Sequence, residues 1–360
     1  MAKRVRLSDI ADRLNITKVT VSKALRDHPD ISRDTRALVK KTAEEMGYSP
    51  NLLARSLSSR KTRTIGVVVP KIAHSFFSSI IDAIQSHATE EGYGVILAVS
   101  NERADLERQH IERLLAMRVD GLLVSVSQQP AEREIYRMVR TMDVPLVFFD
   151  RRLEGEPFSS VTVDDFEGAR KAVAQLLQMG YRNIAHIAGS ADTAIGSARR
   201  SGYVEALRES GVAVEEDWIV EGGFDEQHGY AACKRFLALG KLPEVIFAVS
   251  FPAALGARAA LREAGAEVSG RIELISFGAG GFDEFYMYPH YCIQQPTRDM
   301  GREAVRLLLD EISAQEEGVE LEPRHLTLET RLMMPGDRIG ATRPLPTPQP
   351  TGSAWSRAES

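Results

Sequence analysis

The spacing of apolar residues divides the chain into a short helical head and a longer body in which strands and helices alternate. In the head, four apolar residues fall on one helical face: Leu7, Ile10, Ala11 and Leu14. Thr17 and Ser32 are candidate N-caps of two further helices, and Gly47 can end the last one. Two short helices joined by a tight turn and braced by a third predict a helix-turn-helix, although a three-helix module that binds no DNA fits the same periodicity.

The body begins at Thr64 and repeats short apolar strands followed by amphipathic helices. The predicted strands are Thr64–Val69, Val95–Ser100, Gly121–Ser125, Leu146–Asp150, Val161–Val163, Ile184–Gly189, Val245–Ser250 and Leu274–Phe277. The predicted helices are residues 76–91, 105–117, 131–141, 166–179, 198–210, 227–239 and 253–264. Buried strands that alternate with helices predict parallel sheets covered on both faces. Because the pattern occurs twice, we expect an α/β body of two similar lobes.

Charge separates the same two regions. Residues 1–63 contain 15 Lys and Arg against 7 Asp and Glu, a net charge of +8, whereas the remaining residues carry −13. A basic head on an acidic body favours a polyanionic partner for the head, although a solvated helical surface would carry the same charge. In a helix-turn-helix, the second helix enters the major groove by its N-terminal end. The candidate DNA contacts are Thr17, Lys18, Val19, Thr20, Ser22 and Lys23.

Composition and motifs exclude several classes of protein. The chain has 360 residues, of which 43% are hydrophobic and 26% charged, as in ordinary globular proteins. No apolar run is long enough to cross a membrane and no signal sequence follows the basic start, so we expect a cytoplasmic protein. Two cysteines and eight dispersed histidines predict neither a disulfide scaffold nor a metal site. No nucleotide loop or nucleophile elbow is complete, which predicts no enzyme and no cofactor.

The stretch from Leu7 to Leu57 resembles the lac/galactose repressor family of bacterial transcription factors. The motifs that carry the resemblance are Asp9-Ile10-Ala11, Thr20-Val21-Ser22, Ala24-Leu25, Ile31-Ser32, Thr35-Arg36 and Gly47-Tyr48-Ser49-Pro50-Asn51. It continues to about residue 336 and implies a helix-turn-helix domain over 1–49, a hinge helix and linker over 50–63 and an effector-binding core over 64–336. In the hinge it implies minor-groove contacts by Asn51, Ala54 and Leu57, with Leu57 as the wedge that kinks the duplex.

The resemblance also implies that the core is built like periplasmic sugar-binding proteins. Lobe one would contain residues 64–160 and 293–320, and lobe two residues 161–292 and 321–336. The tail over 337–360 is rich in proline and lacks apolar heptads, which predicts disorder and a dimer rather than a coiled-coil tetramer.

Ligands of parallel sheets bind beyond the carboxyl ends of the strands, which makes the residues at those ends candidates. These are Pro70, Ser125, Asp150, Gly189, Ser250 and Gly278. The resemblance adds Phe76, Phe77, Arg199 and Phe224 as effector contacts, and it supports Asp150. Phe251, next to Ser250, is also a candidate effector contact. Core packing remains an alternative for the phenylalanines, and a structural ion pair for Asp150 and Arg199.

Two positions depart from the family's pattern. Ser250-Phe251 stands where an Asn-Asp or Asp-Asp pair is common, and Gly278 follows a strand where an acid is frequent. Together with Asp150-Arg151, these pairs resemble the fructose-repressor branch, which senses a phosphorylated sugar. We therefore expect a transcriptional repressor whose affinity for an inverted-repeat operator is controlled by a sugar, a sugar derivative or a sugar phosphate. A ligand-capture protein without a role in regulation is the alternative.

Overall fold

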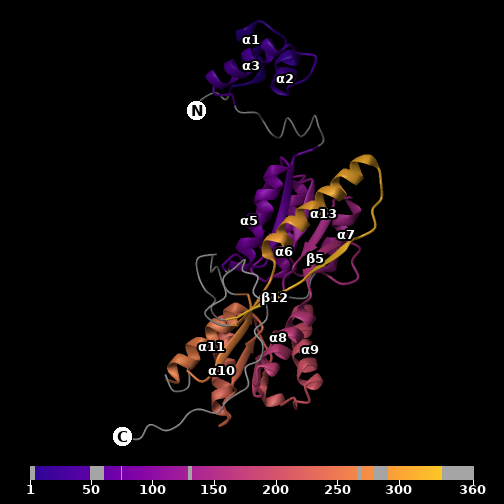
Figure 1. Ribbon diagram of the computed structural model, residues 1–360. Coiled ribbons are helices and arrows are strands. Elements are labelled where there is room, and N and C mark those ends of the chain that lie inside the picture. Colours follow the sequence, from indigo (N-terminus) through magenta and orange to yellow (C-terminus); the bar gives the residue numbers. More distant parts are fainter. Residues whose placement is uncertain are drawn as a thin grey trace. The chain divides into compact units, whose positions relative to one another are not determined.

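A computed structural model of the chain describes residues 5–48, 61–73, 75–128, 132–265, 270–278 and 291–334 (Figure 1). The chain divides into two compact units, one up to Thr62 and the other from Arg63 onward. The predicted hinge contacts Asn51, Ala54 and Leu57 lie outside the described residues, as does the tail.

The first unit contains the three predicted helices, α1 (Leu7–Leu14), α2 (Lys18–Leu25) and α3 (Arg33–Glu45). Both predicted N-caps are confirmed, since the hydroxyls of Thr17 and Ser32 accept hydrogen bonds from the backbone N–H groups three residues later. The core is formed by six residues, two from each helix: Ile10, Ala11, Val21, Ala24, Val39 and Ala43. The recognition helix is therefore fixed by packing as well as by its cap.

The second unit begins with a six-stranded sheet, which we call the sheet of lobe one. Its strands are β1 (Thr64–Val69), β2 (Gly94–Val99), β3 (Gly121–Val124), β4 (Leu146–Phe149), β5 (Ser159–Val163) and β11 (His325–Leu328). They are all parallel, in the order β11-β5-β4-β3-β1-β2. Helices α5 (Ser75–Glu90) and α13 (Thr297–Glu317) pack on one face, and α6 (Ala104–Ala116) and α7 (Arg133–Thr141) on the other.

Lobe two repeats this plan with a second six-stranded sheet. Its strands are β6 (Ile184–Ile187), β7 (Ile219–Val220), β8 (Val245–Ala248), β9 (Glu273–Phe277), β10 (Tyr291–Gln294) and β12 (Arg331–Met333), in the order β12-β10-β9-β8-β6-β7. Only the pairing of β12 is antiparallel within this sheet. Helices α8 (Asp165–Gln178) and α9 (Ala194–Glu209) cover one face, and α10 (Glu226–Ala238) and α11 (Phe251–Glu263) the other. The short 3-10 helix η1 (Glu216–Trp218) precedes β7.

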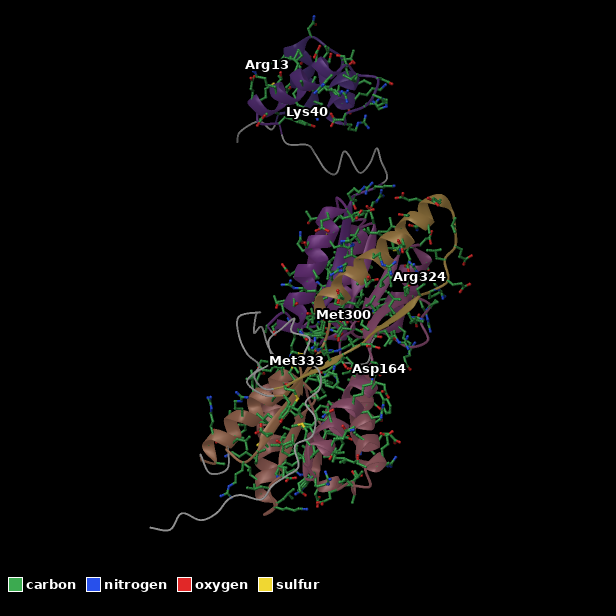
Figure 2. The ribbon with its side chains drawn as sticks, viewed as in Figure 1. Arg13, Lys40, Asp164, Met300, Arg324 and Met333 are labelled. Atoms are coloured by element: carbon green, nitrogen blue, oxygen red, sulfur yellow. The ribbon has the colours of Figure 1, made fainter. Side chains whose placement is uncertain are left out.

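Strand pairing corrects the predicted lobe boundaries. Residues 161–163 belong to β5 and residues 325–328 to β11, and both strands lie in lobe one rather than lobe two. Residues 293–294 belong to β10 of lobe two rather than lobe one. The chain therefore crosses between the lobes after β5, after β10 and after β11. Asp164, Met300 and Met333 lie in this crossing region (Figure 2).

The expectation of fully buried strands is also wrong for β2. Ile96 is 36% exposed and Leu97 is 40% exposed, because β2 forms the edge of its sheet and has a neighbour on one side only. No helix among the described residues is long and apolar enough to span a membrane.

Candidate functional site

The exposed face of α2 carries the residues that the sequence proposes for DNA contact. Thr17, Lys18 and Val19 are exposed, with Val19 at 64%, whereas Thr20 and Ser22 are half-buried. An aliphatic side chain this open on a small domain is free to pack on a base methyl group.

Three of the proposed DNA contacts, Thr17, Thr20 and Lys23, already have partners within the domain. The Thr17 hydroxyl caps the N-terminus of α2 and lies 2.9 Å from the hydroxyl of Thr20, so in the free protein it stabilises the start of the helix. Lys23 is half-buried, and its ammonium pairs with Asp30 at 2.7 Å. A phosphate contact by Lys23 would therefore compete with this exposed ion pair, which is a weak interaction in water.

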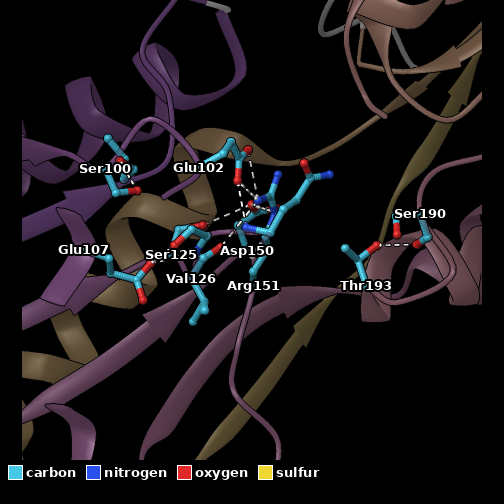
Figure 3. A network of polar contacts seen from close by, with 12 residues as sticks. Ser100, Glu102, Glu107, Ser125, Val126, Asp150, Arg151, Ser190 and Thr193 are labelled. Atoms are coloured by element: carbon cyan, nitrogen blue, oxygen red, sulfur yellow. Dashed lines mark hydrogen bonds and ion pairs between the residues drawn. The ribbon is translucent and has the colours of Figure 1, made fainter. Parts of the chain in front are cut away.

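In lobe one, the predicted residues Ser125 and Asp150 lie together at the carboxyl ends of β3 and β4 (Figure 3). The Ser125 hydroxyl donates to Asp150 Oδ2 at 3.2 Å, and Arg151 Nε lies 3.7 Å from the same oxygen. Asp150 is 6% exposed, and burial raises its pKa to about 6 in spite of the opposing charge of Arg151. Its φ of +62° is a left-handed conformation, which for a non-glycine residue is often found at functional sites.

Sequence reasoning missed Glu102, which holds this corner of lobe one together. Its carboxylate accepts two hydrogen bonds from the Arg151 guanidinium, at 2.9 and 3.1 Å, and one from the backbone N–H of Gln128 at 2.8 Å. The Arg151 guanidinium also lies 5.8 Å from the ring centre of Phe224, a residue of lobe two. Arg151 thus joins the two lobes at the strand ends. The only sequence signal for a role of Arg151 is its position next to Asp150, and Glu102 has no such signal.

In lobe two, the predicted residue Arg199 is buried and fully engaged. It is 4% exposed, and Nε and one terminal nitrogen lie 2.8 and 2.6 Å from Asp165 Oδ1. Its other terminal nitrogen donates to the carbonyl of Val249 at 2.5 Å, and its guanidinium stacks 3.6 Å from the ring centre of Phe277. The ion pair that the sequence left open as an alternative is therefore present. Asp165, at the start of α8, was not foreseen.

Phe224 and Ser250 act as a pair beside Arg199. The Ser250 hydroxyl donates to the Phe224 carbonyl at 2.6 Å and accepts from the backbone N–H of Ala253, so it positions Phe224 and caps α11. A Cβ atom at Gly189 would lie 2.5 Å from the Phe224 ring, which explains why this strand end needs glycine. Ser250 is thus engaged with the protein itself, unlike the direct ligand contact that the sequence proposes.

The remaining candidates divide between the strand ends and the core. Gly278, with φ +75°, lies near Phe251 and near the amide oxygen of Gln295, a buried residue that sequence reasoning missed. Phe77 is buried in the core of lobe one, as the core-packing alternative holds, whereas Phe76 is half-buried and meets Phe77 edge-on. Among the described residues, no three His, Cys, Asp or Glu side chains gather as metal ligands would.

Comparison with known families agrees with both units. Residues 6–51 match the model of bacterial regulatory proteins of the lacI family, and residues 62–326 match that of periplasmic binding proteins and the sugar-binding domain of the LacI family. The chain belongs to the LacI family. It is a helix-turn-helix transcriptional regulator with a ligand-binding core, homologous to known repressors.

Individual relatives cover most of this LacI-family chain. The HTH-type transcriptional repressor PurR of Pectobacterium carotovorum subsp. carotovorum (strain PC1) is 30% identical over 90% of this chain and 95% of its own. The structure of a CelR–cellobiose complex is 30% identical with a TM-score of 0.68, over 92% of this chain and 99% of that one. The Cra regulator of Pseudomonas putida with fructose 1-phosphate is 27% identical with a TM-score of 0.67, over 76% and 98%.

Proposed function

We propose that this LacI-family regulator is a cytoplasmic, dimeric repressor that performs no catalysis and whose affinity for an inverted-repeat operator is set by a sugar or sugar derivative bound between the lobes. The observation that supports DNA binding most directly is the open N-terminal end of α2, where Lys18 and Val19 are exposed above a fully packed domain. In a dimer, the two copies of α2 would occupy half-sites about one helical turn apart, roughly 34–36 Å. Asn51, Ala54 and Leu57 would add minor-groove contacts between the half-sites.

For the effector, we propose a neutral, hydroxyl-rich ligand. Asp150 is a buried carboxylate with two weak contacts, and a ligand hydroxyl would give it the strong donor that burial requires. Two guanidinium groups near it, on Arg151 and Arg199, already have carboxylate partners within 3 Å. A phosphate on the ligand would have to displace one of these partners, at a cost that a free sugar avoids.

The Cra relative was solved with fructose 1-phosphate and the CelR relative with cellobiose, so both ligand classes deserve a direct comparison. Isothermal titration calorimetry of the full-length chain with cellobiose, fructose and fructose 1-phosphate would separate them. Binding of a free sugar that is lost in Asp150→Asn is the expected result. Binding of the phosphorylated sugar alone, with or without the carboxylate, would contradict the neutral-effector proposal.

Operator binding is tested by selection from random-sequence DNA with the full-length protein. We expect enrichment of an inverted repeat. Lys18→Ala should lower the preference for that repeat over random DNA by about tenfold, since a good contact to a base edge discriminates by about 1–3 kcal/mol. Lys41→Ala on α3 is a matched control and should reduce affinity for all sequences alike, if at all. Enrichment of no repeat by the wild type would leave the ligand-capture alternative standing.

A further inference from the structure

Arg63, the first residue of the second compact unit, is held through its backbone N–H, its backbone carbonyl and its side chain. Arg63 directly precedes β1, and the second compact unit begins at this residue. Its backbone N–H donates to Asp120 Oδ2 at 2.8 Å, across 57 positions of sequence, and its carbonyl accepts from the N–H of Gly94 at 2.8 Å. Its guanidinium lies 5.0 Å from the ring centre of Tyr93, which is buried in the core of lobe one. Arg63 is therefore held by Gly94, the first residue of β2, and by Asp120, which directly precedes β3.

The backbone of Arg63 shows that these contacts impose a direction on the chain. Its φ is +49°, in the left-handed region that costs a non-glycine residue about 1–2 kcal/mol. Such a conformation persists only where the surroundings over-determine it. Asp120 contributes twice, because its own N–H also donates to the carbonyl of Thr64 at 2.8 Å. The left-handed backbone of Arg63 is thus held in part by the carboxylate of Asp120.

Asp120 lies at the opposite end of β3 from the effector residues. Strand β3 is buried along its whole length, Asp120 precedes it, and Ser125 follows it with its hydrogen bond to Asp150. At about 3.3 Å per residue, this places the two ends roughly 17 Å apart along one rigid strand. At Gly121 a Cβ atom would lie 2.9 Å from the side chain of Leu308, so α13 packs directly against this end of the strand. Because α13 starts at Thr297, just after the chain crosses between the lobes, two buried elements connect the cleft and the crossing to Asp120.

We propose that Asp120 and Arg63 are positioning residues: their contact couples ligand binding in the core to operator binding by the DNA-binding segment. This inference rests on the proposed function, because it concerns how ligand and operator binding are coupled. Coupling between two sites is reciprocal, so operator binding must alter the core if the core controls operator binding. The contact between Arg63 and Asp120 is where we expect operator binding to change β3 and α13.

The experiment uses hydrogen–deuterium exchange of the full-length protein with and without the inverted repeat that the wild type selects. In the wild type, DNA should slow exchange in peptides that cover residues 118–125 and 297–312 by at least about fivefold, the low end of typical coupling energies. Asp120→Ala should lose this effect of DNA, while exchange of the same peptides without DNA stays at the wild-type level. Asp120→Asn keeps an acceptor oxygen for the Arg63 N–H and should retain the effect.

Asp143→Ala is the matched control, because Asp143 lies in the turn before β4, as Asp120 lies before β3, and β3 separates β4 from the strand that follows Arg63. It should respond to DNA as the wild type does. The proposal is overturned if Asp120→Ala keeps the full response, if Asp143→Ala loses as much, or if the wild type binds the repeat without any change in the core. Failure to select a repeat at all would instead count against the proposed function, so the two failures are distinguishable.

Discussion

The two lobes share one arrangement of strands and helices, but their buried candidate residues, Asp150 and Arg199, are held in opposite ways. In lobe one, Asp150 is desolvated and held by a 3.2 Å hydrogen bond and a 3.7 Å ion contact, on a left-handed backbone. In lobe two, Arg199 has a buried carboxylate at 2.6 Å, a carbonyl at 2.5 Å and an aromatic ring beneath it. Asp150 therefore carries a cost that a ligand can relieve, whereas Arg199 holds elements of lobe two together. Residues that look equally functional in the sequence differ in what they contribute to the free protein.

The largest effect is expected from removing the cation of lobe two. Arg199→Met leaves Asp165 as a buried carboxylate without its partner, which should lower the free energy of unfolding by about 3–5 kcal/mol. Urea denaturation at pH 7 measures this. The double variant Arg199→Met with Asp165→Leu should recover most of the loss, because no uncompensated charge remains.

Arg200→Met is the control for that series, since Arg200 follows on the same helix and forms ion pairs at a half-exposed site. It should cost less than about 1 kcal/mol. Equal stability of Arg199→Met and Arg200→Met would remove the contrast between the lobes.

The next largest effect is a gain in stability, expected from replacing Asp150 in lobe one. The folded pKa of Asp150 is about 6 against a usual value of 3.8, so this group makes the wild type less stable as the pH rises from about 4 to 6. Asp150→Asn removes the penalty and should stabilise the ligand-free protein by up to about 3 kcal/mol above pH 7, and by almost nothing near pH 4. Urea denaturation across this pH range measures the difference. Asp192→Asn, in an exposed loop of lobe two, should show no such pH-dependent gain.

A smaller effect comes from the buried imidazole of lobe two. His186 lies between the rings of Tyr203 and Phe247, at 4.9 and 4.5 Å, and burial lowers its pKa to about 3. Its unfolded pKa is higher, near 6.5, so stability that it contributes at pH 7 is lost as the pH falls, by about 2 kcal/mol at pH 5. His186→Phe should remove this decline in thermal or urea unfolding. His87→Gln on α5 should leave it in place, and an unchanged slope in His186→Phe would contradict the assignment.

The helix-turn-helix and most strands and helices of the core could be predicted because their signals are local. Val67, Val68 and Val69 belong to an apolar run that can only be a buried strand, and Thr17 caps a helix whatever the rest of the chain does. The strands β7 and β10 were missed: β7 has only two residues, too few to show a period, and β10 also pairs with β12, far away in the sequence. The same holds for β11, which pairs with β5 across more than 150 residues.

Within the site, Asp150 and Arg199 could be named from the sequence, but their partners and roles could not. Asp150 was found from its position after a strand, and Arg199 from the family resemblance; Asp150 follows β4 and Arg199 lies on α9. That Ser250 binds the Phe224 carbonyl, and that Asp165 and Glu102 neutralise the arginines, depends on side-chain directions that no spacing rule contains. Those partners decide which charges are available to a ligand.

The claim that a ligand between the lobes controls DNA binding is tested most directly by measuring operator affinity with the sugar bound. Fluorescence anisotropy of the full-length protein on its selected inverted repeat would be followed at increasing concentrations of a sugar that calorimetry shows to bind. We predict that the dissociation constant for DNA changes by at least about fivefold in the wild type and stays constant in Asp150→Asn. A bound sugar that leaves the operator affinity of the wild type unchanged would contradict the claim that the cleft controls DNA binding.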